Sequence, residues 1–433
     1  MGTFKFSIHM LKKESKKSMI YTLTLSLTIA VTFLFYNIID NQYLLDASQI
    51  GKGIQVTDIP FSSILAFIVI MFCAFMIMFA NNFYLSRKLK EIAIMTMSGS
   101  GYISVTMYLF YQNIIMVIIA FPIGLFIGAI GSILSNQLIY QFLDHSAPFF
   151  YVPVESIGNT IICISVIIGA QFIYAAGFVH RKDITFMLSQ EASPVLEDNR
   201  IMKLSPNLYV VIYILGVLGL IMMEYTPSSI LVFSSVGVLG IGGMIKYIFP
   251  KFFKKIKMKR YLNDKLKLIS ISNLYYSLSR SIMLIGLFAL STTAMIIIII
   301  LQKDNPREFI TAIIGFVVII FLLLVSIVYK YILEASTRKT FYYNLYKLGY
   351  SYHQLSRIIQ QEVSLFYMTM VGLPFIYIFI SLVQAIIHND VTIIFALCMM
   401  GIELVPIIIA GLITYRMYKK AVLLVIEEGI KYE

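Results

Sequence analysis

Three polar side chains stand inside long apolar stretches of this sequence, where burying them is costly. Glu403 lies twelve residues from either end of the apolar run 391–415, and Gln112 and Glu362 lie near the starts of two others. Ionisable residues within membrane segments usually mark a function. For Glu403 we expect a structural or conformational role rather than substrate binding. Gln112 and Glu362, at matched positions of the repeat, are candidates for bonding across the pseudo-symmetric interface, although Glu362 reaching water is an equally open interpretation.

No catalytic motif accompanies these residues. The phosphate-binding pattern G-x-x-x-x-G-K-(S/T) is absent, and no zinc or nucleophile motif stands out. Cys73, Cys163 and Cys398 lie far apart in apolar runs, without the spacing of metal ligands. We therefore predict a non-catalytic chain that holds no metal or cofactor of its own. ATP and Mg²⁺ would be bound by a partner chain.

Composition and hydropathy indicate an all-α integral membrane protein. Of the 433 residues, 59% are hydrophobic and only 13% are charged, whereas an ordinary soluble domain is about a quarter charged. A spanning helix needs about 20 mostly apolar residues. Gly124 and Gly128, inside one apolar run, have the small-xxx-small spacing that allows close helix packing. Ten runs of spanning length lie near 18–39, 61–82, 103–133, 156–179, 207–224, 227–246, 281–302, 309–330, 358–387 and 391–415.

The lysines and arginines predict the orientation of these runs. With the N-terminus inside, 31 of the 34 basic residues fall on inside segments, and Lys52, Lys303 and Arg307 fall outside. Because basic residues gather on the cytoplasmic side of membranes, we predict that both termini are cytoplasmic. The net charge of +12 then needs no nucleic-acid partner. The stretch 246–267 mixes aromatic and basic residues, as in helices that lie on anionic headgroups.

Two charged amphipathic segments, about 250 residues apart, each precede a glycine and a long apolar run. A short helix across the membrane surface, with its charges facing outward, is suited to dock a partner, and the glycine lets the chain turn sharply. Glu334 and Arg338 are also spaced to pair at i, i+4. An ordinary interfacial helix is the alternative, but the recurrence favours docking. The candidate docking residues are Arg87, Lys88, Glu91, Gly99, Glu334, Arg338, Lys339 and Gly349.

These segments resemble the FtsX-like permease superfamily of ABC transporters. The likeness rests on the basic residues, glutamate and glycine at 87–99 followed by Gln112, and on a looser copy from Arg338 through Gly349 to Glu362. Ten spans resemble the BceB-type permeases from end to end, with two FtsX-like four-helix modules joined by an extra two-helix hairpin. The resemblance implies a first module at 1–180, a cytoplasmic linker at 181–206, the hairpin at 207–246, a basic segment at 247–280 and a second module at 281–433.

The resemblance also implies a function. Such permeases sit in the bacterial cytoplasmic membrane and work with a separate cytoplasmic ATPase, usually two copies, which binds ATP and Mg²⁺. They transmit force to the outer leaflet (mechanotransmission) and confer resistance to antimicrobial peptides such as bacitracin and lantibiotics, by export or by releasing the peptide from its lipid-bound target. Many also signal to a sensor histidine kinase. This chain departs from them in having only a short turn at 303–308, where they carry a large extracellular domain, and in having Phe341 at the position that matches Glu91.

Two other functions stay open. One is an FtsX-like regulatory membrane protein without transport, against which ten spans argue, because four are expected there. The other is a secondary transporter driven by an ion gradient, with Glu403 as its proton site. That transporter would work without any ATPase partner.

Overall fold

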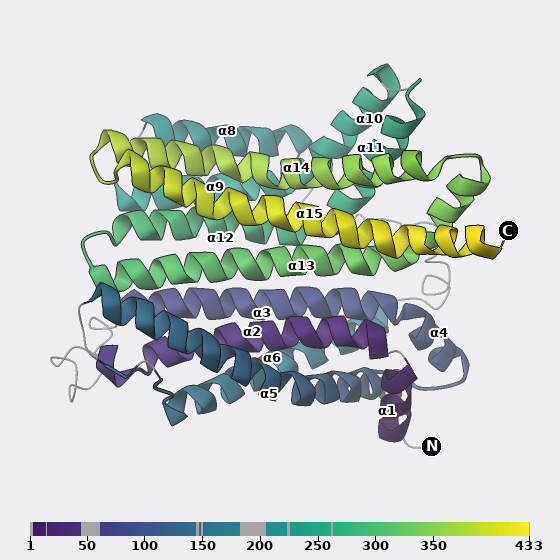
Figure 1. The fold of residues 1–433 in the computed structure, drawn as a ribbon, viewed down its shortest axis with the longest axis horizontal. Coiled ribbons are helices and arrows are strands. Elements are labelled where there is room, and N and C mark those ends of the chain that lie inside the picture. Colours follow the sequence, from purple (N-terminus) through teal and green to yellow (C-terminus); the bar gives the residue numbers. More distant parts are fainter. Residues whose placement is uncertain are drawn as a thin grey trace. The chain divides into compact units, whose positions relative to one another are not determined.

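The structure of the chain is a computed structural model that describes residues 3–13, 15–44, 61–143, 147–148, 150–181, 205–222, 226–260 and 263–432. These residues are almost entirely helical and form no strand (Figure 1), in agreement with the predicted all-α class. The helices are α1 (Thr3–Lys13), α2 (Ser15–Ile39), the 3₁₀ turn η1 (Gln42–Leu44), α3 (Phe61–Arg87), α4 (Leu89–Met97), α5 (Tyr102–Phe142), α6 (Val154–Arg181), α8 (Pro206–Met222), α9 (Pro227–Gly243), the π-helical turn η3 (Met244–Ile248), α10 (Phe249–Arg260), α11 (Lys265–Arg280), α12 (Ile282–Leu301), α13 (Pro306–Lys347), α14 (Tyr352–Ile387) and α15 (Ile393–Tyr432).

Eight of the described helices are long and apolar enough to cross a membrane, namely α2, α3, α5, α6, α12, α13, α14 and α15. A ninth candidate is the pair Val232–Ile248 and Lys251–Lys259, which is bent by 45°. Helix α8 has 17 residues, so at 1.5 Å per residue it is about 26 Å long, a little shorter than a hydrocarbon core of about 30 Å. Each of the ten predicted runs falls on a helix, but a total of ten spans stays a prediction.

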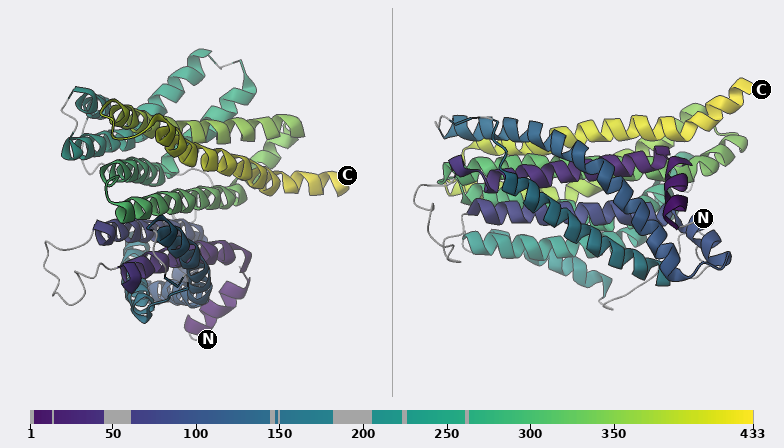
Figure 2. Two further views of the ribbon diagram at one scale, coloured as in Figure 1. Left: turned by 60° about the vertical axis from the view of Figure 1, so that its left-hand side comes forward. Right: turned by 90° about the horizontal axis from the view of Figure 1, so that it is seen from below.

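The described helices group into two compact units. The first comprises Met1–Asp198 and Pro306–Gly315. Within it, α2 packs along α5 and against α3 and α6, and these helices run side by side in Figures 1 and 2. At Gly124 of α5, an added Cβ would lie 2.7 Å from the carbonyl oxygen of Ser26, and Gly128 approaches α2 as closely. The close packing predicted from these two glycines is confirmed.

The second unit comprises Asn199–Asn305 and Phe316–Glu433. Helix α14 packs against α11, α12 and α15, and α9 packs against α8 and α12. The α8–α9 hairpin is tied to α14 by two hydrogen bonds, from the Tyr377 hydroxyl to the Tyr213 carbonyl at 2.5 Å and from the Tyr213 hydroxyl to the Leu373 carbonyl at 3.1 Å. The hairpin therefore packs within this unit. The module boundaries given above stay predictions, and most of the predicted linker lies outside the described residues.

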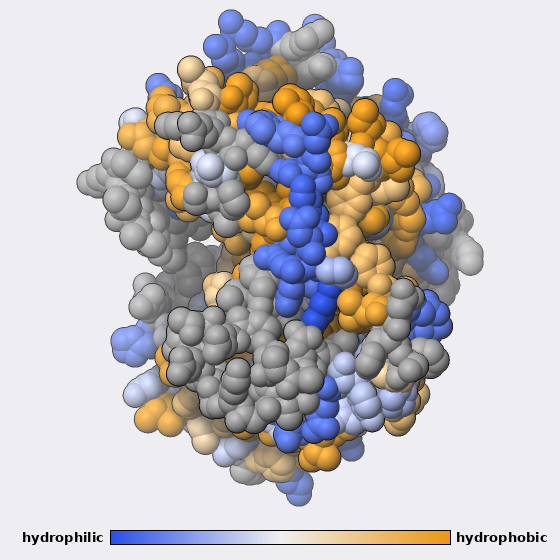
Figure 3. Space-filling view, turned by 90° about the vertical axis from the view of Figure 1, so that its left-hand side faces the viewer, coloured by the Kyte–Doolittle hydropathy of each residue, from blue (hydrophilic) through white to orange (hydrophobic). Residues whose placement is uncertain are grey.

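The outer faces of the helices are apolar. Phe126 of α5, Ile173 of α6, Leu239 of α9 and Ile408 of α15 are each more than 60% exposed. Figure 3 looks onto one end of the helices, where hydrophobic and hydrophilic side chains both reach the surface. A soluble protein rarely leaves so much apolar surface open. These faces are suited to contact lipid, as expected of a multi-pass membrane protein.

Candidate functional site

Each amphipathic segment ends in the same backbone turn. Gly99 follows α4 with φ +86°, and Gly349 follows α13 with φ +91°. In both turns the glycine N–H donates to the carbonyl three residues earlier, and the next N–H donates to the carbonyl five residues earlier. This is the Schellman motif, in which glycine is favoured because other residues resist a positive φ. The next helices begin at Tyr102 and Tyr352, so the sharp turn predicted at both glycines is confirmed.

Behind the first turn, Lys88 occupies the bend between α3 and α4 and is only 2% exposed. Its Nζ donates to both carboxylate oxygens of Glu91 at 2.9 Å. The Tyr108 hydroxyl donates to Glu91 Oε2 at 2.9 Å and accepts from Gln112 Nε2 at 2.8 Å. Gln112 Oε1 in turn accepts from the Tyr84 hydroxyl at 2.8 Å. A continuous chain of polar contacts thus joins α3, α4 and the start of α5.

Further polar contacts extend from this chain into the interior of the first unit. Tyr21 of α2 stacks on Tyr84 with 5.0 Å between ring centroids, and its hydroxyl donates to Asn113 Oδ1 at 3.2 Å. Asn113 donates to the side-chain oxygen of Gln171 on α6. The α4 turn is therefore connected through side-chain hydrogen bonds to α2 and α6 as well as to α3.

In the second unit, Arg338 lies at the centre of a buried ion cluster. Its guanidinium donates to Glu334 Oε1 and to Glu362 Oε1, both at 2.7 Å. Lys330 Nζ lies 3.0 Å from Glu334 Oε2 and donates to the Ser277 carbonyl of α11 at 3.3 Å. All four charged residues are at most 8% exposed. Two cations and two carboxylates balance, so the cluster carries no net charge when all four are ionised.

Aromatic residues surround this cluster. Arg338 lies 4.8 Å from the centroid of the Tyr276 ring and donates to the Tyr418 hydroxyl at 3.3 Å. The Tyr342 hydroxyl donates to Glu362 Oε2 at 3.4 Å. Burial, together with the Glu362 carboxylate, raises the pKa of Tyr342 well above its usual value, so this hydroxyl keeps its proton and stays a donor. The cluster joins α11, α13, α14 and α15 immediately behind the second turn.

Three pairs of positions that are 250 residues apart make corresponding contacts in the two units. They are 84 and 334, 88 and 338, and 112 and 362. In the first unit Lys88 lies 5.8 Å from the Tyr84 ring centroid, and Tyr84 bonds Gln112. In the second unit Arg338 bonds both counterparts. The repeat found in the sequence is therefore accompanied by similar contacts. The uncharged Tyr84 and Gln112 of the first unit are replaced by the carboxylates of Glu334 and Glu362 in the second.

Residues 63–183 match the family model described as FtsX-like permease C-terminal. The match supports an FtsX-like permease domain in this part of the chain. It runs from α3 to the end of α6 and includes the first glycine turn and the polar chain behind it. It covers less than a third of the sequence. No curated protein matches the chain.

The expectation that the charges of both segments face outward is wrong for three residues. Lys88 in the FtsX-like segment, and Glu334 and Arg338 in the later copy, are buried. The reason is physical, because each finds an opposite charge that offsets its desolvation. The predicted pairing of Glu334 with Arg338 is confirmed. Lys339 is half-buried, and the side chain of Arg87 lies outside the described residues.

The two segments also differ in shape. In the FtsX-like segment, α4 is a separate short helix after a bend at residue 88, as predicted. In the later copy no separate short helix forms, because α13 runs unbroken from Pro306 to Lys347. The side chains that do face outward near the first turn are largely apolar, and Ile94, Met97 and Ile103 are each at least 60% exposed. Leu348 at the second turn is 76% exposed.

The intramembrane polar residues fall into two groups. Gln112 and Glu362 are 0% exposed and are bonded within their own units, so the interpretation that Glu362 reaches water is wrong. Glu403 of α15 is equally buried, but neither of its carboxylate oxygens has a hydrogen-bond partner among the described residues. Such a group is destabilising unless something offsets its burial. It lies apart from the ion cluster, with no described hydrogen bond to it.

Sequence reasoning missed Lys330, Tyr84 and Tyr108 as members of these networks. Lys330 could have been found from its spacing, since Lys330, Glu334 and Arg338 recur at i, i+4 and i+8 along one helix face. Tyr84 could have been found because it falls on Glu334 at the shift of 250 residues. Tyr108 falls on an isoleucine at that shift, and no sequence signal indicated it. Among the described residues, no group of three or more His, Cys, Asp or Glu side chains is placed to hold a metal.

Proposed function

We propose that this chain is the membrane permease subunit of an ABC-type system and works with a separate cytoplasmic ATPase. The FtsX-like match at 63–183 supports this assignment, because permeases of this family are generally non-catalytic subunits served by an ATPase. The observation that carries the proposal is the shared glycine turn. In both units a Schellman turn presents apolar side chains outward, and a polar or ionic network lies directly behind it.

This arrangement is suited to transmit force. The hydrogen bonds of each Schellman turn close the end of the preceding helix in a defined geometry. Behind Gly349, the contacts of Arg338 with Glu334 and Glu362 tie α13 to α14. Because a buried, paired charge resists separation from its partners, a push on the turn would move both helices together. ATP-driven motion of a partner would then reach the far ends of the spans.

The docking surface in this proposal is apolar at its centre. Met97 and Leu348 lie within two residues of the two glycines and are 63% and 76% exposed. Interfaces generally have an apolar core inside a polar rim. The turn tips would enter grooves on the ATPase, with Lys339 at the rim. Two copies of the ATPase, one for each turn, fit this arrangement.

A finer assignment follows from the sequence resemblance. We propose a BceB-type role in resistance or immunity to cell-wall-targeting antimicrobial peptides, by mechanotransmission that releases the peptide from the membrane or from its lipid-bound target. The two glycine-terminated segments and the apolar runs support it. The short turn between α12 and α13, in place of a large extracellular domain, favours direct action within the membrane over capture by an outer domain. It also weighs against kinase signalling of the usual BceB kind.

The test is co-purification of the chain from its native membrane, followed by mass spectrometry and an ATPase assay. The variant Met97→Glu with Leu348→Glu places charges at both turn tips, while Met258→Glu makes the same change at an exposed methionine of α10 that belongs to neither turn. We expect an ATPase to co-purify with the wild-type chain and with Met258→Glu, and to be lost from the double variant. If no ATPase accompanies the wild type, or if the double variant retains it fully, the proposal fails.

One observation favours a second candidate function. Glu403 is fully buried without a described partner, as is expected of a proton-binding carboxyl in a transporter driven by an ion gradient. In proteoliposomes without an ATPase, such a transporter would move its substrate when a proton gradient is imposed, and Glu403→Gln would stop that movement. Activity that needs ATP and survives Glu403→Gln would exclude this candidate.

A further inference from the structure

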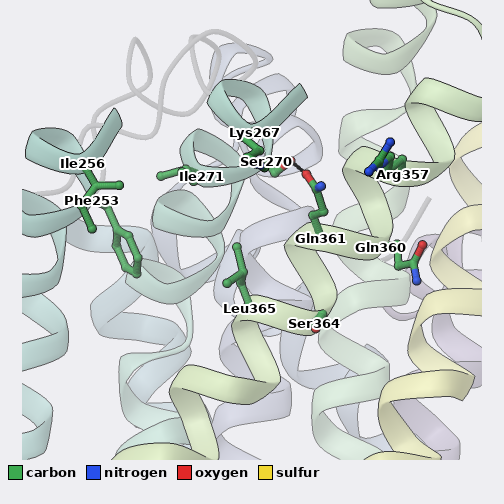
Figure 4. A pocket seen from close by; sticks show the side chains of 10 residues that line it. All are labelled: Phe253, Ile256, Lys267, Ser270, Ile271, Arg357, Gln360, Gln361, Ser364 and Leu365. Carbon is green, nitrogen blue, oxygen red and sulfur yellow. Dashed lines mark hydrogen bonds between the residues drawn. The ribbon is translucent and has the colours of Figure 1, made fainter. Parts of the chain in front are cut away.

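A cavity of about 650 Å³ lies between α10, α11 and α14 of the second unit. Its volume is within the usual range of small-molecule sites. Three helices each contribute one face, as Figure 4 shows. The lining residues are Phe253 and Ile256 of α10, Lys267, Ser270 and Ile271 of α11, and Arg357, Gln360, Gln361, Ser364 and Leu365 of α14. On α14 these positions follow helical spacing, so a single stripe of that helix lines the cavity.

The lining changes from charged to apolar along the helix axis. Arg357 lies near the start of α14, and Leu365 lies eight residues further in, which is about 12 Å at 1.5 Å per residue. In Figure 4, Lys267 and Arg357 lie toward the top of the view on different helices, Leu365 lies lower on α14 beside Ser364, and Phe253 lies on α10 at the left. Between them, the Ser270 hydroxyl donates to Gln361 Oε1 at 2.9 Å. Such a gradient matches a molecule with a charged head and an apolar tail.

The charge of the site specifies an anionic head. Arg357 is exposed, and no described carboxylate pairs with it. Lys267 lies 3.3 Å from Asp264 Oδ2, and both side chains are about half exposed. The stretch 246–267 carries nine lysines and arginines against the single acidic residue Asp264. Arginine and lysine are the usual donors to phosphate oxygens.

We infer that this cavity binds an anionic phospholipid. Its phosphate lies between Arg357 and Lys267, the amides of Gln360 and Gln361 donate to the glycerol and ester oxygens, and an acyl chain lies against Phe253, Ile256 and Leu365. A specific lipid at this place would fix α10 and α11 against the end of α14 that follows the Gly349 turn. This inference does not depend on the proposed ATPase partnership.

Native mass spectrometry of the whole chain in detergent tests the inference directly. The probes are phosphatidylglycerol, phosphatidylcholine with the same acyl chains, inorganic phosphate and glycerol phosphate. We expect at least one phosphatidylglycerol to bind in preference to phosphatidylcholine. In Lys267→Gln with Arg357→Gln its affinity falls by about tenfold or more, because two charge-assisted contacts to the phosphate are lost. The soluble phosphates do not displace the lipid, since they cannot occupy the apolar part.

Matched variants distinguish a specific lipid-binding site from general electrostatic attraction of lipid to a basic surface. Lys254→Gln with Lys255→Gln removes the same charge from exposed lysines of α10 that do not line the cavity, and it is expected to leave the tight lipid in place. Ser364→Trp keeps every charge and fills the cavity, and it is expected to expel the lipid. The inference would be overturned if both double variants lost the lipid equally, if phosphatidylglycerol and phosphatidylcholine bound equally well, or if inorganic phosphate displaced the lipid. All four changed charges are on exposed side chains, so folding is not at stake.

Discussion

The ion cluster around Arg338 gives the sharpest quantitative prediction. Replacing Arg338 with methionine would leave Glu334 and Glu362 buried at 4% and 0% exposure, with only Lys330 to balance two carboxylates. Replacing Glu362 with glutamine would leave an excess positive charge instead. Changing both residues together leaves Lys330 and Glu334, which lie 3.0 Å apart, as a balanced pair. Glutamine is also the residue that the first unit carries at the corresponding position, Gln112.

The magnitude follows from this charge balance. Removing one partner of a buried ion pair costs about 3–5 kcal/mol of folding free energy, because a charge is left uncompensated. We expect a loss in that range for Arg338→Met and a smaller loss for Glu362→Gln. Combining the two changes should recover at least about 2 kcal/mol relative to the sum of the single losses, since contacting residues are not additive. The stability of Arg338→Lys should lie between those of the wild type and Arg338→Met, because lysine keeps the charge but lacks the guanidinium fork that reaches both carboxylates.

The assay is unfolding by added SDS in mixed micelles, followed by far-ultraviolet circular dichroism, since the chain has no tryptophan. Lys303→Met serves as the control, because Lys303 pairs with Asp390 at an exposed position, where solvent screening leaves an ion pair little effect on stability. If the losses of Arg338→Met and Glu362→Gln simply add in the double variant, the two groups do not interact as charges. A Glu362→Gln variant as stable as the wild type would refute the reasoning in another way, by showing that Glu362 is not ionised.

Three further predictions concern single positions, each followed in the same unfolding assay. Gly349→Ala and Gly99→Ala should each destabilise by about 1 kcal/mol, because alanine resists the positive φ of the turn; an unchanged stability would contradict the strained-turn account. Gly124→Ala should cost about 1–3 kcal/mol through overpacking against α2, whereas Gly169→Ala, where nothing lies within 4 Å, should stabilise its helix by about 0.5–1 kcal/mol. Glu403→Gln should be neutral or stabilising, because the carboxyl it replaces has no described partner; a loss above about 2 kcal/mol would indicate an ionised, paired Glu403.

Much of the fold could be predicted because it follows from local chemistry. Apolar runs of spanning length, glycine before each long helix, and the small-xxx-small spacing of Gly124 and Gly128 all act within a few residues, and the structure places a helix or a close contact at each. The number of membrane spans was harder to predict, because it depends on the exact length of each helix. Helix α8 has 17 residues, so hydropathy alone does not establish a tenth span.

The candidate site was only half predictable, because its residues are set by tertiary contacts. The sequence indicates that Lys88 and Arg338 are important but not which way they face. A charged residue on an amphipathic segment is ordinarily assigned to solvent, and only the partners brought by other helices reverse that assignment. For Arg338 the decisive partner is Glu362, 24 residues away on the next helix. The partner of Lys88 is Glu91, three residues further along the chain. Because this pairing is local, it could have been predicted from the sequence.

The difference between the two turns has a mechanical consequence. In the first unit, α3 and α4 are separate helices that meet at Lys88, which pairs locally with Glu91 of α4. The residue that corresponds to Glu362 there is the uncharged Gln112. In the second, α13 has no break, and Glu362 holds it to α14 through an ion pair. A helix boundary is a natural hinge, whereas an unbroken helix with a buried ion pair resists bending. We therefore expect a push at Gly99 to be absorbed partly by rotation of α4, and a push at Gly349 to move α13 and α14 together.

Spin labels on exposed residues of α4 and of the last turns of α13 would show unequal displacement relative to their own units when a partner ATPase is trapped with nucleotide. Equal displacement in both units would mean that the bend at Lys88 does not act as a hinge.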